Sequence, residues 1–77
     1  MRFITKVKYL TGSKLEVTFD NCETRIVDLK DYLEGEIFEP LRDLDFFKKV
    51  SLNTDIDTIV WANDADFSPD FLYEISQ

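Results

Sequence analysis

The chain has 77 residues, which suits one domain (residues 1–77), because two domains of half that length would each lack an adequate core. Its net charge of −7, from 9 basic and 16 acidic residues, disfavours direct binding to nucleic acid and to anionic membranes. With no histidine and a single cysteine, the chain lacks the residues for Ser-His or Cys-His nucleophile systems and for Cys/His zinc sites. We therefore expect no enzyme, no catalytic residue, no cofactor and no metal.

The sequence favours a cytoplasmic location. Its longest apolar run, residues 59–62, is far too short to cross a bilayer, and the first residues do not follow a signal-peptide pattern. Cys22, as a lone cysteine, forms no internal disulfide, which agrees with a reducing compartment.

Three strands are predicted in the first part of the chain. Residues 3–10 alternate imperfectly between apolar and basic side chains, residues 14–20 alternate cleanly, and residues 24–29 form a third β-prone run. In the turn between the second and third runs, Asn21 is expected to take a positive φ. The side chains expected to face the core are Phe3, Val7, Tyr9, Leu15, Val17 and Phe19.

The middle of the chain changes to helical spacing. Residues 30–35 suit a short helical turn that ends at Gly35. Apolar residues then recur at helical spacing over residues 38–47, where Pro40 is well placed at a first helical position.

The last part predicts two more strands and a final helix. Residues 50–53 and 58–61 return to β-strand patterns on either side of a turn. Ser68, Pro69 and Asp70 supply an N-cap, a first-position proline and a first-turn acid, so a helix is expected to begin there.

The order β-β-β-α-β-β-α predicts an α+β fold, with one small antiparallel sheet of about five strands and short helices on one face. An open sheet leaves two exposed edges. Lys6 and Lys8 protect the first strand, so we expect the other edge to bind a partner or to support a weak homo-oligomer.

Three stretches resemble the bacterial family called domain of unknown function 2442. These are "LEVTFDN", "FEPLRD" with Phe47, and "TIVWANDADFSPDFLY". The third is the most specific, and its matches to the family signature are Trp61, Asn63, Asp66, Pro69, Asp70, Leu72 and Tyr73. Asn21 and Asp64 stand where the family prefers glycine, and both residue types tolerate positive φ.

The resemblance implies no enzymatic activity and offers no catalytic residues. Members of the family occur alone or fused to a helix-turn-helix domain, and short members are often encoded beside another small protein, as in toxin–antitoxin pairs. We therefore expect a small non-catalytic interaction module, the antitoxin-like or adaptor member of a two-gene pair, whose partner is a basic protein or the product of the neighbouring gene. The alternative is an accessory transcription-linked regulator that acts through a DNA-binding partner.

Trp61, Asp64 and Asp66 are the predicted partner-binding residues, and each has a structural interpretation beside it. Tryptophan is enriched at interface hot spots, but in a small domain it is more often a core aromatic with a local hydrogen bond. The aspartates, with Asn63 and Asp70, resemble a calcium loop, yet the required glycine is absent and a proline intrudes. Helix caps and a solvated turn are therefore favoured over a metal site.

An acidic run is expected to form a solvated face that is available to a basic partner. Arg25 and Arg42 are candidates for ion pairs with its members. The carboxylates of the run are Asp28, Asp31, Glu34, Glu36 and Glu39.

Overall fold

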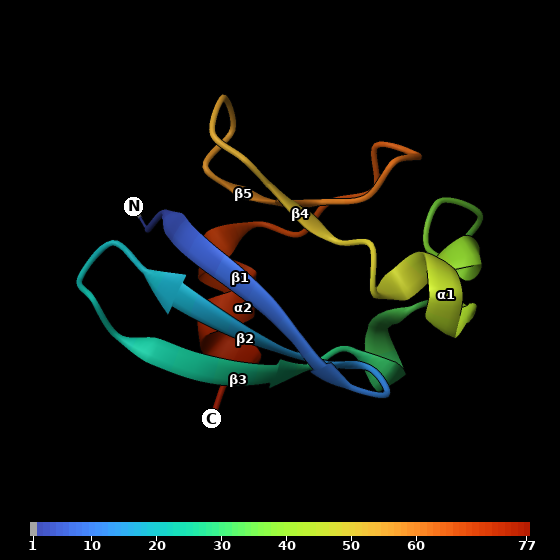
Figure 1. Ribbon diagram of the computed structural model, residues 1–77, viewed down its shortest axis with the longest axis horizontal. Helices are drawn as coiled ribbons and strands as arrows, with labels where there is room; N and C mark the ends of the chain where they lie inside the picture. Colours follow the sequence, from blue (N-terminus) through green and yellow to red (C-terminus); the bar gives the residue numbers. More distant parts are fainter. Residues whose placement is uncertain (1) are drawn as a thin grey trace.

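The first three strands form an antiparallel meander in the computed structural model, which describes residues 2–77. β1 (Ile4–Thr11), β2 (Lys14–Phe19) and β3 (Thr24–Asp28) lie in the order β1-β2-β3 (Figure 1). This is the meander that the sequence predicts, with strand limits that differ from the predicted ones by one residue or so.

The last two strands form a separate hairpin. β4 (Ser51–Asn53) pairs with β5 (Thr58–Val60) in a two-stranded sheet, and the hairpin runs at an angle to β1 (Figure 1). The α+β class and the five strands are confirmed, but they make two sheets instead of one. The Ile4 N–H donates to the Asp57 carbonyl (2.8 Å) and links the sheets at one end. A hairpin that crosses at an angle cannot continue the ladder of hydrogen bonds.

The core lies on the inner face of the three-stranded sheet. Leu15, Val17 and Phe19 are at most 1% exposed, as predicted from their alternation. On β1, however, Ile4 is 2% exposed and Phe3 is 39% exposed, so the prediction that Phe3 faces the core is wrong. The register shifts between Ile4 and Lys6, and one extra residue in a strand reverses which side chains face inward.

The middle segment contains two 3₁₀ turns, η1 (Lys30–Tyr32) and η2 (Glu39–Arg42), and one helical turn, α1 (Leu44–Phe47). The continuous helix predicted over residues 38–47 is interrupted at Asp43, whose backbone is extended. The Asp43 side chain accepts a hydrogen bond from the Asp45 N–H (3.0 Å). An aspartate favours this capping geometry over a helix interior, which explains the break.

The final helix, α2 (Pro69–Ile75), covers the inner face of the three-stranded sheet (Figure 1). It begins as predicted: the Ser68 side chain accepts a hydrogen bond from the Phe71 N–H (3.1 Å), and Pro69 is at the first position. Leu72 is fully buried. Within residues 2–77, none of the helices combines the length and the apolar character needed to cross a membrane.

Three non-glycine residues within residues 2–77 have a positive φ, each in a different turn: Cys22, Asp57 and Asp64. Cys22 (φ 68°), and not Asn21, takes this conformation in the β2–β3 turn, so the prediction for Asn21 is wrong. The Asn21 side chain instead accepts a hydrogen bond from the Glu23 N–H (3.0 Å), a local bond that fixes Asn21 as the start of the turn. Asp64, also at φ 68°, follows the expectation for a residue that replaces glycine.

Candidate functional site

Trp61 lies in the core, with 2% of its surface exposed. Its Nε1–H donates a hydrogen bond to the Phe47 carbonyl (2.8 Å). Its ring packs against Phe47 and Phe67, at centroid distances of 5.5 and 6.0 Å. This burial supports the interpretation of Trp61 as a core aromatic, and contact between Trp61 and a partner stays a prediction.

Asn63 holds the loop after Trp61 in place through one hydrogen bond within the loop and one to a distant segment. The Asn63 side chain donates to the Ile37 carbonyl (2.8 Å) and accepts from the Ala65 N–H (3.2 Å). Asp66 pairs with Val60 as an isolated bridge, which extends the second sheet by one residue. In the part of the chain that the structure describes, no three His, Cys, Asp or Glu side chains are grouped to hold a metal. Asp64 and Asp66 are exposed, and partner binding by these two stays a prediction.

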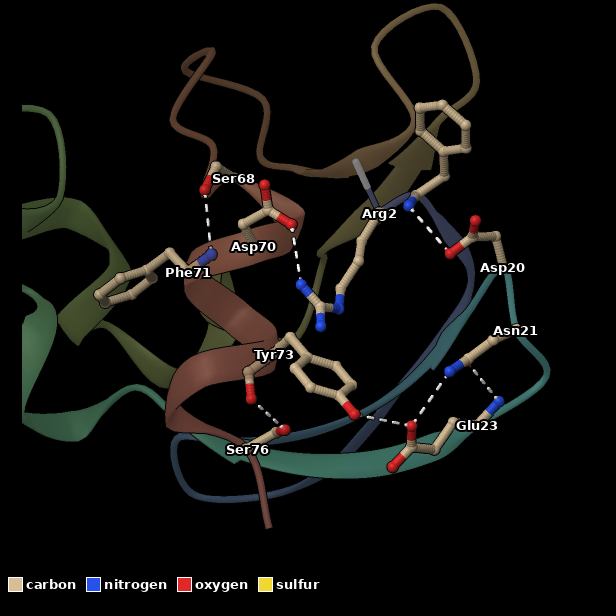
Figure 2. Close-up of polar contacts among 10 residues, drawn as sticks. Arg2, Asp20, Asn21, Glu23, Ser68, Asp70, Phe71, Tyr73 and Ser76 are labelled. Carbon is tan, nitrogen blue, oxygen red and sulfur yellow. Dashed lines mark hydrogen bonds and ion pairs between the residues drawn. The ribbon is translucent and has the colours of Figure 1, made fainter.

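A polar cluster around Tyr73 ties α2 to the β2–β3 turn (Figure 2). The Tyr73 hydroxyl donates to Glu23 (3.0 Å), which also pairs with Arg25 (2.8 Å). The guanidinium carbons of Arg2 and Arg25 lie 3.8 and 4.4 Å from the centroid of the Tyr73 ring. Arg2 also pairs with Asp70 (3.3 Å). Because each arginine has a carboxylate partner, the cluster is a clamp between elements and not a free cationic site.

The edge of β3 that faces away from β2 presents backbone groups to solvent. Bonds from the Phe19 N–H to the Glu23 carbonyl (2.9 Å) and from the Leu29 N–H to the Ser13 carbonyl (3.0 Å) fix the ladder. Hydrogen bonding alternates along an antiparallel strand. The intervening β3 residues whose backbone groups point outward are therefore Thr24, Ile26 and Asp28.

The centre of this edge is occupied by the chain itself. The Ile26 N–H donates to the Gln77 carbonyl (3.1 Å), and the Gln77 N–H donates to the Ile26 carbonyl (2.9 Å). Thr24 and Asp28, on either side, form no such backbone pair with any other residue of the described chain. The edge is therefore partly closed at one point and open at its two ends.

A groove of about 610 Å³ runs beside this edge. Its apolar lining comes from four different elements and consists of Leu10, Ile26, Tyr32 and Ile75. Ile26 and Tyr32 are 43% and 40% exposed, so the groove presents apolar surface to solvent. Clustered exposed apolar surface is typical of a binding site. We define the β3-edge groove as this cavity together with the outward backbone of β3.

The charged lining of the β3-edge groove is mainly acidic. Asp28 and Asp31 face it with one lysine, Lys14. Asp28 accepts hydrogen bonds from the Ser13 hydroxyl (2.7 Å) and the Lys30 N–H (3.1 Å). These two bonds lower the pKa of the Asp28 carboxyl, the serine bond having the larger effect. The carboxylate is therefore held ionised and oriented.

The other carboxylates of the acidic run, Asp31, Glu34, Glu36 and Glu39, are exposed as predicted. The ion pairs predicted between this run and two arginines are not those that form. Arg25 pairs with Glu23, and the Arg42 Nε–H donates to the Leu33 carbonyl (2.9 Å). In both cases, a polar group on a spatially adjacent turn is the nearer partner.

Comparison with known proteins places the chain in a family without giving it a function. No curated protein and no solved structure matches it. A sequence profile of the family described as "Protein of unknown function (DUF2442)" matches residues 4–77, nearly the whole chain. The match spans every strand and helix of the fold, including the Trp61–Tyr73 segment on which the resemblance chiefly depends. The chain therefore belongs to the DUF2442 family.

Proposed function

We propose that this chain is a non-catalytic protein-interaction module that binds an extended, basic segment of another protein in the β3-edge groove. The segment would add to the sheet as a strand beside β3. Its apolar side chains would contact the groove, and its basic side chains would face Asp28 and Asp31. The product of a neighbouring gene is the partner that we expect in the cell.

The outward backbone of β3 is the observation that carries the proposal. Thr24 and Asp28 offer N–H and C=O groups on both sides of the point where Gln77 pairs with Ile26. Edge strands with free backbone groups accept an additional strand, whose main-chain bonds supply affinity and whose side chains supply specificity. The two hydrogen bonds between Ile26 and Gln77 are a small barrier to such a partner.

Charge and apolar surface support the same partner chemistry. The net charge of −7 attracts a basic segment and repels an acidic one. Exposed Ile26 and Tyr32 lie next to the two aspartates of the groove, so alternating apolar and basic side chains would find complementary contacts.

The test is a nuclear magnetic resonance titration with two capped peptides, one alternating lysine and valine and the other alternating glutamate and valine. We expect the lysine peptide to shift the amide signals of Thr24 and Asp28, because these groups would gain hydrogen-bond partners, and that of Ile26, because its bond to Gln77 would be perturbed or replaced. The glutamate peptide is the matched control for chain length and strand propensity, and we expect it not to bind.

Equal shifts with both peptides would show that the acidic groove does not select a basic segment, which would contradict the proposed partner chemistry. Shifts confined to β4 or to residues 61–66 would move the interface away from the β3-edge groove and end this proposal. The lysine peptide could also shift signals outside β3 only, with shifts that disappear at high salt. That result would indicate nonspecific electrostatic attraction and contradict binding at β3.

A further inference from the structure

A second, smaller pocket has a lining of different chemistry. It has a volume of about 330 Å³ and lies between the β1–β2 turn, at Gly12 and Ser13, and the segment that contains η1, η2 and α1. Its apolar surface consists of Leu33, Leu41, Leu44 and Phe47. Its charged residues are Lys30 and Arg42, and no carboxylate lines it. The lining is thus apolar and cationic in a chain that is strongly acidic.

The two cations of this pocket are available to a ligand. Within residues 2–77, neither Lys30 nor Arg42 lies within ion-pair distance of a carboxylate, whereas Arg2 and Arg25 each have one. The Arg42 Nε–H donates to the Leu33 carbonyl (2.9 Å), which anchors the guanidinium at the pocket. Its terminal nitrogens retain donors for an anion.

The apolar wall is partly open to solvent. Leu41 and Phe47 are each 1% exposed and close the pocket toward the core, but Leu44 is 52% exposed. Leu44 lies beside these buried side chains in the lining, so a ligand would find a continuous apolar surface that ends at the two cations.

From this arrangement we infer that the pocket binds a small amphiphilic carboxylate, in which a short alkyl or aryl group is joined to one carboxylate. The carboxylate would lie at Arg42 and Lys30, and the apolar group would lie along Leu44. Ligand pockets begin at about 300 Å³, so this one suits a molecule of about ten heavy atoms and not an added strand. The site is distinct from the β3-edge groove and does not depend on it.

Octanoate is the probe for the test, followed by nuclear magnetic resonance on the whole chain. For a ligand of about ten heavy atoms we expect a dissociation constant on the order of 1–10 mM. The amide signals of Gly12, Ser13 and Leu44 should shift, while those of Thr24 and Ile26 should not. Octan-1-ol, which has the same chain without the charge, should bind more weakly.

The variant Lys30→Gln/Arg42→Gln should weaken octanoate binding by about fivefold or more, because two exposed charges are removed. Lys49→Gln is the control: it removes an exposed lysine from a neighbouring position outside the pocket. Leu44→Gln, at a position that is 52% exposed, removes apolar surface without adding charge and should abolish binding. The inference is overturned if octanoate causes no shift at the pocket up to about 20 mM. It is overturned equally if octan-1-ol binds as well as octanoate, or if both the double variant and Leu44→Gln bind like the natural chain.

Discussion

Ile26 and Gln77 exchange two backbone hydrogen bonds, of 3.1 and 2.9 Å, at the middle of the edge that we propose as a binding surface. An incoming strand must either stop beside this pair or replace it. The pair therefore sets how much of the edge is available, and it links the position of residue 77 to partner binding.

Replacing Gln77 by proline should open the edge. Proline lacks the N–H that donates to the Ile26 carbonyl, so we expect a loss of about 0.5–1.5 kcal/mol in the free energy of unfolding. The same change removes a competitor, so the lysine–valine peptide should bind about two- to tenfold more tightly. Gln77→Ala keeps the backbone bonds and is the control. Weaker peptide binding by Gln77→Pro than by Gln77→Ala would show that residue 77 helps to form the site.

Trp61→Ala should destabilise the chain by about 3–5 kcal/mol, because it leaves a large cavity in the core. Trp61→Phe keeps an aromatic ring but removes the Nε1–H donor to Phe47. The Val50 N–H also donates to that carbonyl (3.2 Å), so losing the tryptophan bond should cost only about 0.5–1.5 kcal/mol. Urea unfolding of the two variants measures both effects. Near-natural stability of Trp61→Ala would contradict the core assignment.

The conformation of Asp64 predicts two different outcomes at one position. Asp64→Asn should change the free energy of unfolding by less than about 0.5 kcal/mol, since both residues tolerate positive φ. Asp64→Val should cost about 1–2 kcal/mol, because a β-branched side chain at φ 68° is strained. Thermal unfolding of the two variants is the measurement. A valine variant as stable as the asparagine variant would mean that the turn adopts another conformation.

The sequence predicted those parts of the fold that local patterns determine. Alternation placed Leu15, Val17 and Phe19 in the core, and Ser68 followed by Pro69 marked the start of α2. Phe3 was placed wrongly because a bulge reverses alternation without leaving a clear signal in the sequence. The division into two sheets was also missed, because the angle between β1 and the β4–β5 hairpin depends on packing between distant segments.

The candidate sites were harder to predict, because each gathers residues from several elements. An exposed edge away from the first strand was expected, but its partial closure by Gln77 depends on where α2 directs the chain. Spacing could not predict that Arg42 has no carboxylate partner within residues 2–77. Its side chain bonds instead to the backbone carbonyl of Leu33, and any residue type could supply that group. The interface prediction for Trp61 depends on residue type alone, whereas its burial depends on the packing of Phe47 and Phe67, which spacing does not predict.

Stability should fall in acid through two carboxylates. Hydrogen bonds to Glu23 from Asn21 and Tyr73, with the Arg25 charge, lower the pKa of Glu23 from an ordinary value of 4.5. The pKa of Asp28 is also lowered, from 3.8. In each case the unfolded chain binds the proton more readily, so the contribution is complete above the ordinary pKa and is lost as pH falls through the folded-state value.

Glu23→Gln should therefore flatten the dependence of stability on pH below about pH 4.5, and Tyr73→Phe should flatten it partly by removing one donor. Urea unfolding across the acid range compares both variants with the natural chain. Identical acid profiles for all three would show that Glu23 contributes nothing to acid unfolding.

The most direct test of the proposed binding surface compares Ile26→Lys with Ile56→Lys. Both isoleucines are exposed, at 43% and 47%, and both substitutions add one positive charge, but Ile56 lies in the β4–β5 turn, away from the β3-edge groove. Calorimetric titration with the lysine–valine peptide, and then with the neighbouring gene product, measures the effect. We predict that Ile26→Lys abolishes binding and that Ile56→Lys preserves it. Binding that survives Ile26→Lys, or that is lost equally in both variants, would contradict binding at β3.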